Sequence, residues 1–133
     1  MNNPTLYILM RTDMASMNPG KGMAQAAHAA NAFVFETGER LTGYDQWAGF
    51  EHDTSQGFGT TIVLDAGDEE SLKKVISLAQ GQEFAANTVT DITYPVRDGR
   101  VTHLINTITC GYVFTPCRIA HPVPALASLP LHA

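Results

Sequence analysis

Three polar residues, Lys21, Gln25 and His28, have the spacing of neighbours on one side of a helix. At roughly 100° per residue they share one arc of about 60°. Their ammonium, amide and imidazole groups can donate hydrogen bonds to an oxyanion or a phosphate. Lys21 would fall in the first helical turn, whose unpaired N–H groups and dipole also favour an anion. The same residue types are ordinary on the solvent face of an amphipathic helix, and spacing alone leaves both interpretations open.

The stretch that must position these groups is MNPGKGMAQAAHAANAFVF, residues 17–35. Asn18-Pro19-Gly20 is a turn signal, and the alanine-rich run after it predicts a helix from about Lys21 to Phe35. The apolar side chains expected on the face opposite Lys21 are Met23, Ala26, Ala27, Ala30, Phe33 and Val34. We expect that apolar face to pack on a sheet.

A continuous apolar run, Thr5–Met10, precedes this helix. It predicts a strand that is buried on both faces at the centre of a sheet. Arg11-Thr12-Asp13 follows at the carboxyl end of the strand, where open α/β sheets bind ligands. The GxxxxGK[ST] pattern of a phosphate-binding P-loop is absent from this stretch.

The remaining patterns alternate between helix and strand. They predict a short helix with an aromatic stripe in Leu41–Phe50, a strand over Thr60–Leu64, a turn over Asp65–Asp68, a helix that begins at Asp68 and ends at Gly81, a strand over Phe84–Thr93 that Pro95 ends, and a strand over Val101–Phe114. We expect the last two strands to form a hairpin with a loop longer than two residues. This order predicts a three-layer α/β domain spanning residues 1–133, with a mixed four-stranded sheet and helices on both faces.

The segment 115–133 contains four prolines and cannot be one regular element. We expect a proline-rich tail that packs on the body or on a partner. The apolar residues available for that contact are Ile119, Val123, Leu126, Leu129 and Leu131.

Net charge and the distribution of apolar residues indicate which classes of protein the chain can belong to. The 133 residues carry a net charge of −5, which argues against a broadly basic surface for nucleic acid but leaves room for a local basic patch. No stretch approaches the roughly 18 apolar residues of a membrane span, and no targeting pattern opens the chain, so we expect a cytoplasmic protein without a membrane contact.

Other candidate sites are weakly supported. Two cysteines make no disulfide framework, and a zinc site at Cys110, Cys117 and His121 would lack a fourth ligand. The adjacent pair His52-Asp53 on a polar loop is a poor catalytic dyad. We therefore expect no metal and no cofactor.

The first half of the chain resembles the type II peptidyl-tRNA hydrolases. In that family a strand ends in Arg-[Asn/Thr]-Asp, and a helix of the form GKGKxAAQCxHA follows; here the matching stretches are LYILMRTD and GKGMAQAAHA. Gln46-Trp47 and the block TTIVLDAGDEESLKKVISLA also match in order and spacing. Thr90-Asp91 falls where the family has the aspartate of an Asp-Ala-Gly-Arg-Thr stretch. The resemblance covers most of residues 5–114.

The resemblance implies a hydrolase of the ester that joins a peptide to the terminal ribose of tRNA, usually a homodimer. Lys21, Gln25 and Asp91 match the family's catalytic positions. By that match Lys21 and Gln25 would stabilise the oxyanion or hold the terminal phosphate and carbonyl, and Asp91 would orient or deprotonate water.

The resemblance also implies residues that bind the substrate. We expect these to be Arg11, Asp13, His28 and a threonine of the last strand. Asp13 would fix the loop before the helix, and His28 would serve as a relay or a structural residue. The threonine is Thr102 or Thr107, and we take Thr107 as the candidate.

Several positions depart from the family pattern. Pro19 replaces the first lysine of the loop, the sequence ITYPV after Asp91 lacks the Arg-Thr pair, and CGYVFTP replaces the glycine-proline end of the last strand. Two cationic groups are thus missing from a site that would meet a polyanion. Two other functions therefore remain open: a non-catalytic binding or dimerisation module with the same fold, and a hydrolase of a different small ester or amide.

Overall fold

In a computed structural model, which describes residues 3–37, 40–49 and 59–133, the chain forms one sheet covered by helices. The elements are β1 (Thr5–Arg11), α1 (Pro19–Glu36), α2 (Tyr44–Ala48), β2 (Thr61–Gly67), α3 (Glu69–Gly81), β3 (Ala85–Asp98), β4 (Val101–Thr115) and a short 3₁₀ helix (Pro124–Leu126). Within the described residues, no helix is both long enough and apolar enough to cross a membrane.

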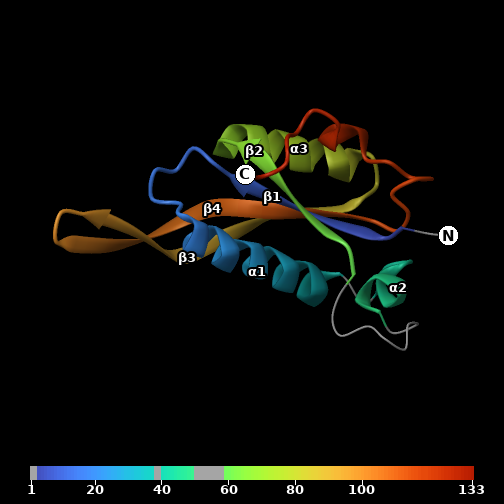
Figure 1. The fold of residues 1–133 in the computed structure, drawn as a ribbon, viewed down its shortest axis with the longest axis horizontal. Coiled ribbons are helices and arrows are strands. Elements are labelled where there is room, and N and C mark those ends of the chain that lie inside the picture. Colours follow the sequence, from blue (N-terminus) through green and yellow to red (C-terminus); the bar gives the residue numbers. More distant parts are fainter. Residues whose placement is uncertain (1–2, 38–39, 50–58) are drawn as a thin grey trace.

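The four strands lie in the order β2-β1-β4-β3, so β1 is central, as its uninterrupted apolar sequence predicts. β1 pairs in parallel with β2 and antiparallel with β4, and β3 pairs antiparallel with β4. α1 covers one face of this mixed sheet and α3 covers the other (Figure 1). The predicted three-layer α/β architecture is confirmed.

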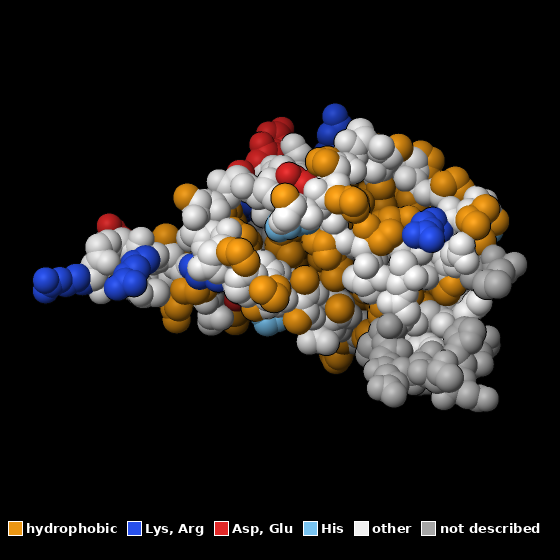
Figure 2. Space-filling model, in the orientation of Figure 1, with side chains coloured by type: hydrophobic (Ala, Val, Ile, Leu, Met, Phe, Trp, Pro, Cys, Tyr) orange, Lys and Arg blue, Asp and Glu red, His pale blue; other side chains and the backbone are white. Residues whose placement is uncertain are grey.

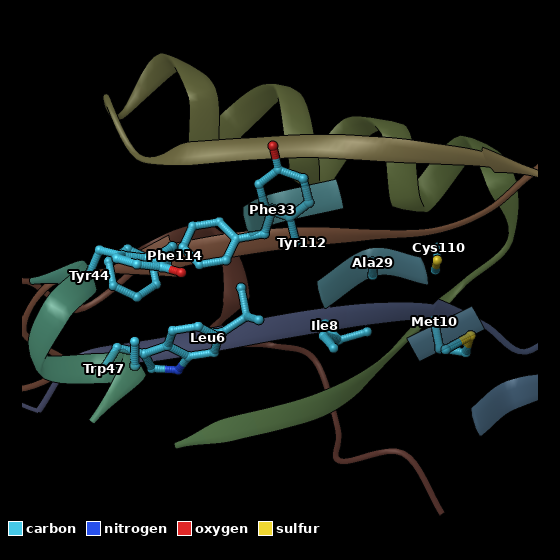
Figure 3. Close-up of a cluster of buried hydrophobic side chains, with 11 residues drawn as sticks. Leu6, Ile8, Met10, Ala29, Phe33, Tyr44, Trp47, Cys110, Tyr112 and Phe114 are labelled. Carbon is cyan, nitrogen blue, oxygen red and sulfur yellow. The ribbon is translucent and has the colours of Figure 1, made fainter. Parts of the chain in front are cut away.

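Aromatic rings gather at one end of the core between the sheet and α1, and Ile8, Met10 and Cys110 lie toward the other end (Figure 3). Phe33 is fully buried, and its ring centroid lies 4.9 Å from that of Phe114 and 5.4 Å from that of Trp47. Tyr44 and Trp47 are buried as the aromatic stripe predicts. The third member of that stripe, Phe50, lies outside the described residues, as does the pair His52-Asp53.

The predicted orientation of α1 is wrong by about a quarter turn. Its buried residues are Gln25, Ala29 and Phe33, while Met23, expected on the buried face, is 70% exposed. Alanines add little apolar area, so they do not decide which side of a helix faces the sheet. Gln25 can be buried because its side-chain amide has hydrogen-bond partners on both sides, and a hydrophobic pattern cannot anticipate such partners.

Two predicted strand ends are also wrong. Asp65 and Gly67, expected in a turn, continue β2 and pair with Met10 and Arg11 of β1. Pro95 does not end β3, which runs on to Asp98. β3 is an edge strand of the sheet, and there a proline without an N–H is tolerated.

The β3–β4 hairpin extends past the N-terminal end of α1 as an arm (Figure 1). Asp98 pairs with Val101, so the loop has only the two residues Gly99 and Arg100, shorter than predicted. Gly99 has φ of +60°, a conformation that glycine adopts without strain at the first position of a two-residue hairpin loop.

The segment after Thr115 packs on the α3 side of the sheet. Val123 and Leu126 are buried there, whereas Ile119 and Leu131 are 73% and 71% exposed, so their expected contact with a partner stays a prediction. The last residues run beside β2: Asp65 N donates to the Pro130 carbonyl over 2.8 Å. This segment therefore covers an otherwise unpaired sheet edge.

Gly111 of β4 leaves no room for a side chain beneath α3. A Cβ at this position would lie 2.8 Å from the Asn87 carbonyl oxygen and 3.0 Å from Ile76 Cδ1. Gly111→Ala is therefore expected to lower the free energy of unfolding by about 1–3 kcal/mol. Gly81→Ala is the control, because a Cβ there meets no atom within 4 Å. Denaturant unfolding checks both variants, and equal midpoints would contradict this packing.

Candidate active site

The centre of the site is a hydrogen bond between α1 and β3. Gln25 Nε2 donates to Asp91 Oδ2 over 2.8 Å, and Thr109 Oγ1 of β4 donates to Gln25 Oε1 over 2.6 Å. Gln25 is 4% exposed and Thr109 is fully buried. Because the ionised Asp91 carboxylate can only accept, the amide N–H group of Gln25 must face it, and the amide oxygen at the other end accepts from Thr109.

A bulge in β4 makes this arrangement possible. Val89 pairs with Cys110, but the next residue of β3 pairs with Ile108, so Thr109 is an extra residue. The side chains of Thr109 and Cys110 consequently point to the same face of the sheet, and both bond to Gln25. A regular strand would send one of them to the α3 side.

A second bulge, in β3, shapes the other side of Asp91. Asp91 pairs with Thr107, but Tyr94 pairs with Ile105, so the ladder has more residues on β3 than on β4. The irregular backbone lets Thr93 N and Thr93 Oγ1 donate to Asp91 Oδ1 over 2.8 and 3.2 Å. Of the roughly four lone-pair positions of the carboxylate, three are used, and one is left for a water or a substrate group.

These contacts set the charge of Asp91. Partial burial raises the pKa of its carboxyl, but hydrogen bonds from Gln25 and Thr93, with the nearby His28, outweigh burial and hold the pKa below its ordinary value. Asp91 is therefore ionised at neutral pH. An ionised carboxylate with a low pKa is better suited to orient water than to remove its proton.

Lys21 lies one helical turn before Gln25 and reaches the same strand. Its Nζ donates to the Pro95 carbonyl over 3.0 Å and lies 5.4 Å from the ring centroid of Tyr94. Asn18 caps α1 by accepting from Lys21 N over 2.9 Å, which fixes the first turn. An ammonium has three N–H donors, so two others can serve a substrate.

Arg11 and Asp13 form a separate group. Arg11 donates to both carboxylate oxygens of Asp13 over 3.0 Å, and its Nη1 donates to the Ile108 carbonyl over 2.8 Å and to Thr107 Oγ1 over 3.3 Å. Thr107 lies opposite Asp91 in the β3–β4 ladder, but in the part of the chain that the structure describes no side-chain hydrogen bond or ion pair is found between these residues and the Gln25–Asp91 pair. The hydrogen bond from Arg11 to Asp13 raises the pKa of the guanidinium and lowers the pKa of the carboxyl.

The hydrogen bonds of Arg11 connect the end of β1 to β4. The role of Arg11, Asp13 and Thr107 in substrate binding stays a prediction. His28, one turn beyond Gln25, is exposed on α1.

The residues considered for zinc do not form a metal site. Cys110 is buried under α1, and burial raises the pKa of its thiol to about 11. Its sulfur donates to the Gln25 carbonyl instead. Among the described residues, no three or more His, Cys, Asp or Glu side chains lie together as metal ligands would.

Comparison with protein families identifies the chain. A family model described as Peptidyl-tRNA hydrolase PTH2 matches residues 5–116. The chain belongs to this family. A solved structure of a protein of unknown function from Agrobacterium tumefaciens superposes with a TM-score of 0.58 at 13% identity, with 100% of each chain covered, which shows a shared fold. Among curated proteins no match was found.

Within this peptidyl-tRNA hydrolase fold, sequence reasoning missed Thr109 and Tyr94. Tyr94 is fully buried, and its hydroxyl lies 3.0 Å from Ser16 Oγ in the loop before α1. Neither residue lies in a motif that stands out in the sequence. Thr109 is one of four threonines spaced along the last strand, and only the bulge distinguishes it from Thr107.

Thr109→Val is expected to destabilise this family member by about 1–3 kcal/mol. Valine preserves the volume but leaves the buried Gln25 Oε1 without the donor that Thr109 supplies. Thr107→Val is the matched control, because Thr107 is only half-buried and accepts a long hydrogen bond from Arg11. Thermal or denaturant unfolding measures the difference, and an equally small cost at both positions would argue against Thr109 as the donor that satisfies Gln25.

Proposed function

We propose that this chain hydrolyses the ester bond of peptidyl-tRNA and releases peptide and tRNA. Family membership supports the reaction class. The observation that supports these residues as the site is the hydrogen bond from Gln25 to Asp91, which lies one helical turn from Lys21. An ammonium, an amide N–H and a carboxylate are thereby presented together at the N-terminal half of α1. This combination suits attack of water on an ester.

The reaction would begin with a water held by the remaining lone pair of Asp91. Attack on the ester carbonyl gives a tetrahedral intermediate whose oxyanion accepts hydrogen bonds from Lys21 and from the second N–H of Gln25. The bond between the carbonyl carbon and the ribose oxygen then breaks. One proton of the water passes to that ribose oxygen, and the carbonyl carbon keeps the hydroxyl as a carboxylic acid.

The charges near the site are compatible with a tRNA partner. Although the chain is acidic overall, its hairpin carries exposed Arg97, on the strand that Lys21 contacts, and exposed Arg100 in the loop, and Figure 2 shows Lys and Arg side chains on this arm. These cations and Lys21 can approach successive phosphates. Because peptidyl-tRNA arises during translation, we also propose that the protein acts in the cytoplasm, and we retain the homodimer as a proposal from the family resemblance.

Incubation with peptidyl-tRNA labelled in the peptide tests the function. We expect free peptide and intact tRNA to appear at a rate proportional to enzyme concentration. Wild-type protein that binds the labelled tRNA without releasing peptide would instead support a non-catalytic module. Release only from small peptide esters, with none from peptidyl-tRNA, would identify a hydrolase of a different substrate.

A further inference from the structure

A cavity of about 540 Å³ lies beside α1, on the flank away from Gln25 and Asp91. Met10 and Val63 line it from β1 and β2, whereas Gln25 reaches across to β3 and β4. The strand order β2-β1-β4-β3 therefore places the cavity and the Gln25–Asp91 pair on opposite sides of the helix. Figure 2 shows hydrophobic side chains in the hollow between α1 and the end of the chain.

The walls of the cavity are mainly apolar and adaptable. Three of the five methionines of the chain, Met10, Met17 and Met23, line it. Methionine side chains are flexible and fit apolar groups of varied shape. None of the described residues that line the cavity is Lys, Arg, Asp or Glu. The amide oxygen of Asn18, which also lines it, already accepts a hydrogen bond as the cap of α1. An uncharged apolar group of variable shape fits this lining, whereas a phosphate does not.

Some residues that line the cavity lie next to residues of the candidate active site. Asn18, Pro19 and Gly22 line the cavity from the same helical turns that carry Lys21. Met17 also lines it, and the Tyr94 hydroxyl donates to Met17 Sδ over 3.7 Å. A helix is about 10 Å across with its side chains, so roughly three extended residues, at about 3.3 Å each, span it.

We propose that this cavity binds apolar side chains of the peptidyl part of the substrate, about three residues from the ester. The inference rests on the proposed hydrolase function and deepens it, because it assigns a preference for apolar peptides. The end of the chain does not fill the cavity: His132 N donates to the Val63 carbonyl over 2.9 Å, and His132 thereby forms a wall.

Direct binding tests the site without any turnover. Protein labelled with ¹³C at its methionine methyl groups is titrated with N-acetyl-leucine amide, with N-acetyl-serine amide and with adenosine monophosphate. We expect saturable shifts of Met10, Met17 and Met23 with the leucine probe alone. Met14 is the internal reference, because it does not line the cavity. Saturable shifts of these methionines with the nucleotide and not with the leucine probe would overturn the assignment in favour of a nucleobase site.

Gly22→Leu provides a variant that fills the cavity. Gly22 lines it, and a Cβ there meets no atom within 4 Å, so the side chain starts in open space beside the cavity. We expect affinity for the leucine probe to fall at least tenfold. Gly81→Leu is the matched control, since it makes the same change in α3, where a Cβ also meets no atom within 4 Å. Equal affinities in the two variants would overturn the site.

Kinetics separates this inference from the function on which it rests. Wild-type protein and Gly81→Leu should hydrolyse a leucine-containing peptidyl-tRNA with kcat/KM on the order of tenfold above that for a serine-containing one. Gly22→Leu should abolish that preference. Equal rates for both peptides in the wild type, without methionine shifts, would overturn the cavity assignment and leave the hydrolase standing. Binding of the leucine probe by a protein that hydrolyses neither substrate would overturn the function and support the apolar site.

Discussion

Lys21→Ala is expected to lower kcat/KM for peptidyl-tRNA by about 10²–10³-fold, the effect of removing one oxyanion contact. The ammonium is the strongest hydrogen-bond donor at this end of α1, and a charge-assisted bond to a developing oxyanion strengthens as the negative charge forms. Gln25→Ala should lower kcat/KM by a smaller factor, because a neutral amide forms a weaker hydrogen bond to the oxyanion than an ammonium does.

Stability measurements distinguish this loss of rate from unfolding. Lys21 contributes one hydrogen bond to Pro95 and a contact with the ring of Tyr94, so its removal should cost only about 1 kcal/mol. Lys74→Ala makes the same change at an exposed position of α3 and should keep full activity. Unchanged turnover in Lys21→Ala would remove the lysine from the mechanism.

The features that sequence predicted well are those set by local pattern. The segment Leu6–Met10 of β1 is apolar because it has neighbours on both faces, and Asp68 caps α3 by accepting from Ser71 N over 2.8 Å. Such features depend on residues close in the chain. The order of elements follows from them, and connection rules leave few topologies for that order.

The features that sequence missed depend on pairing between distant residues. Whether Thr107 or Thr109 faces Gln25 is decided by a bulge, and the bulge is visible only in the register of β4 against β3. The burial of Gln25 likewise depends on partners 66 and 84 residues away. Pro95 stays in a strand only because β3 lies at the edge of the sheet, which is a property of the complete topology.

Asp91→Asn is expected to reduce kcat about 10²-fold or more while preserving the shape of the side chain. The carboxylate accepts from Gln25 on one oxygen and from Thr93 on the other. Asparagine offers a single acceptor oxygen, so one of these donors loses its partner and the position of the attacking water is no longer held. Asp98→Asn, an exposed change near the tip of the same hairpin, controls for the loss of charge.

The pH dependence of stability gives an independent check. The pKa of Asp91 is lower in the folded protein than its ordinary value of about 3.9, so folding favours the ionised form. The stabilisation is therefore present above that value and is lost as the pH falls through the folded pKa. We expect the stability difference between wild type and Asp91→Asn to stay constant from about pH 8 to 5 and to shrink below about pH 4.

The pH profile of the rate decides what Asp91 does. If the ionised carboxylate orients water, the acid limb of kcat/KM in the wild type should lie below about pH 4, because only protonation of Asp91 removes its acceptor. An acid limb at higher pH that persists in Asp91→Asn would assign the proton transfer to another group. Asp91 would then act as a positioning residue for Gln25, and its replacement by asparagine would lower the rate without moving the limb.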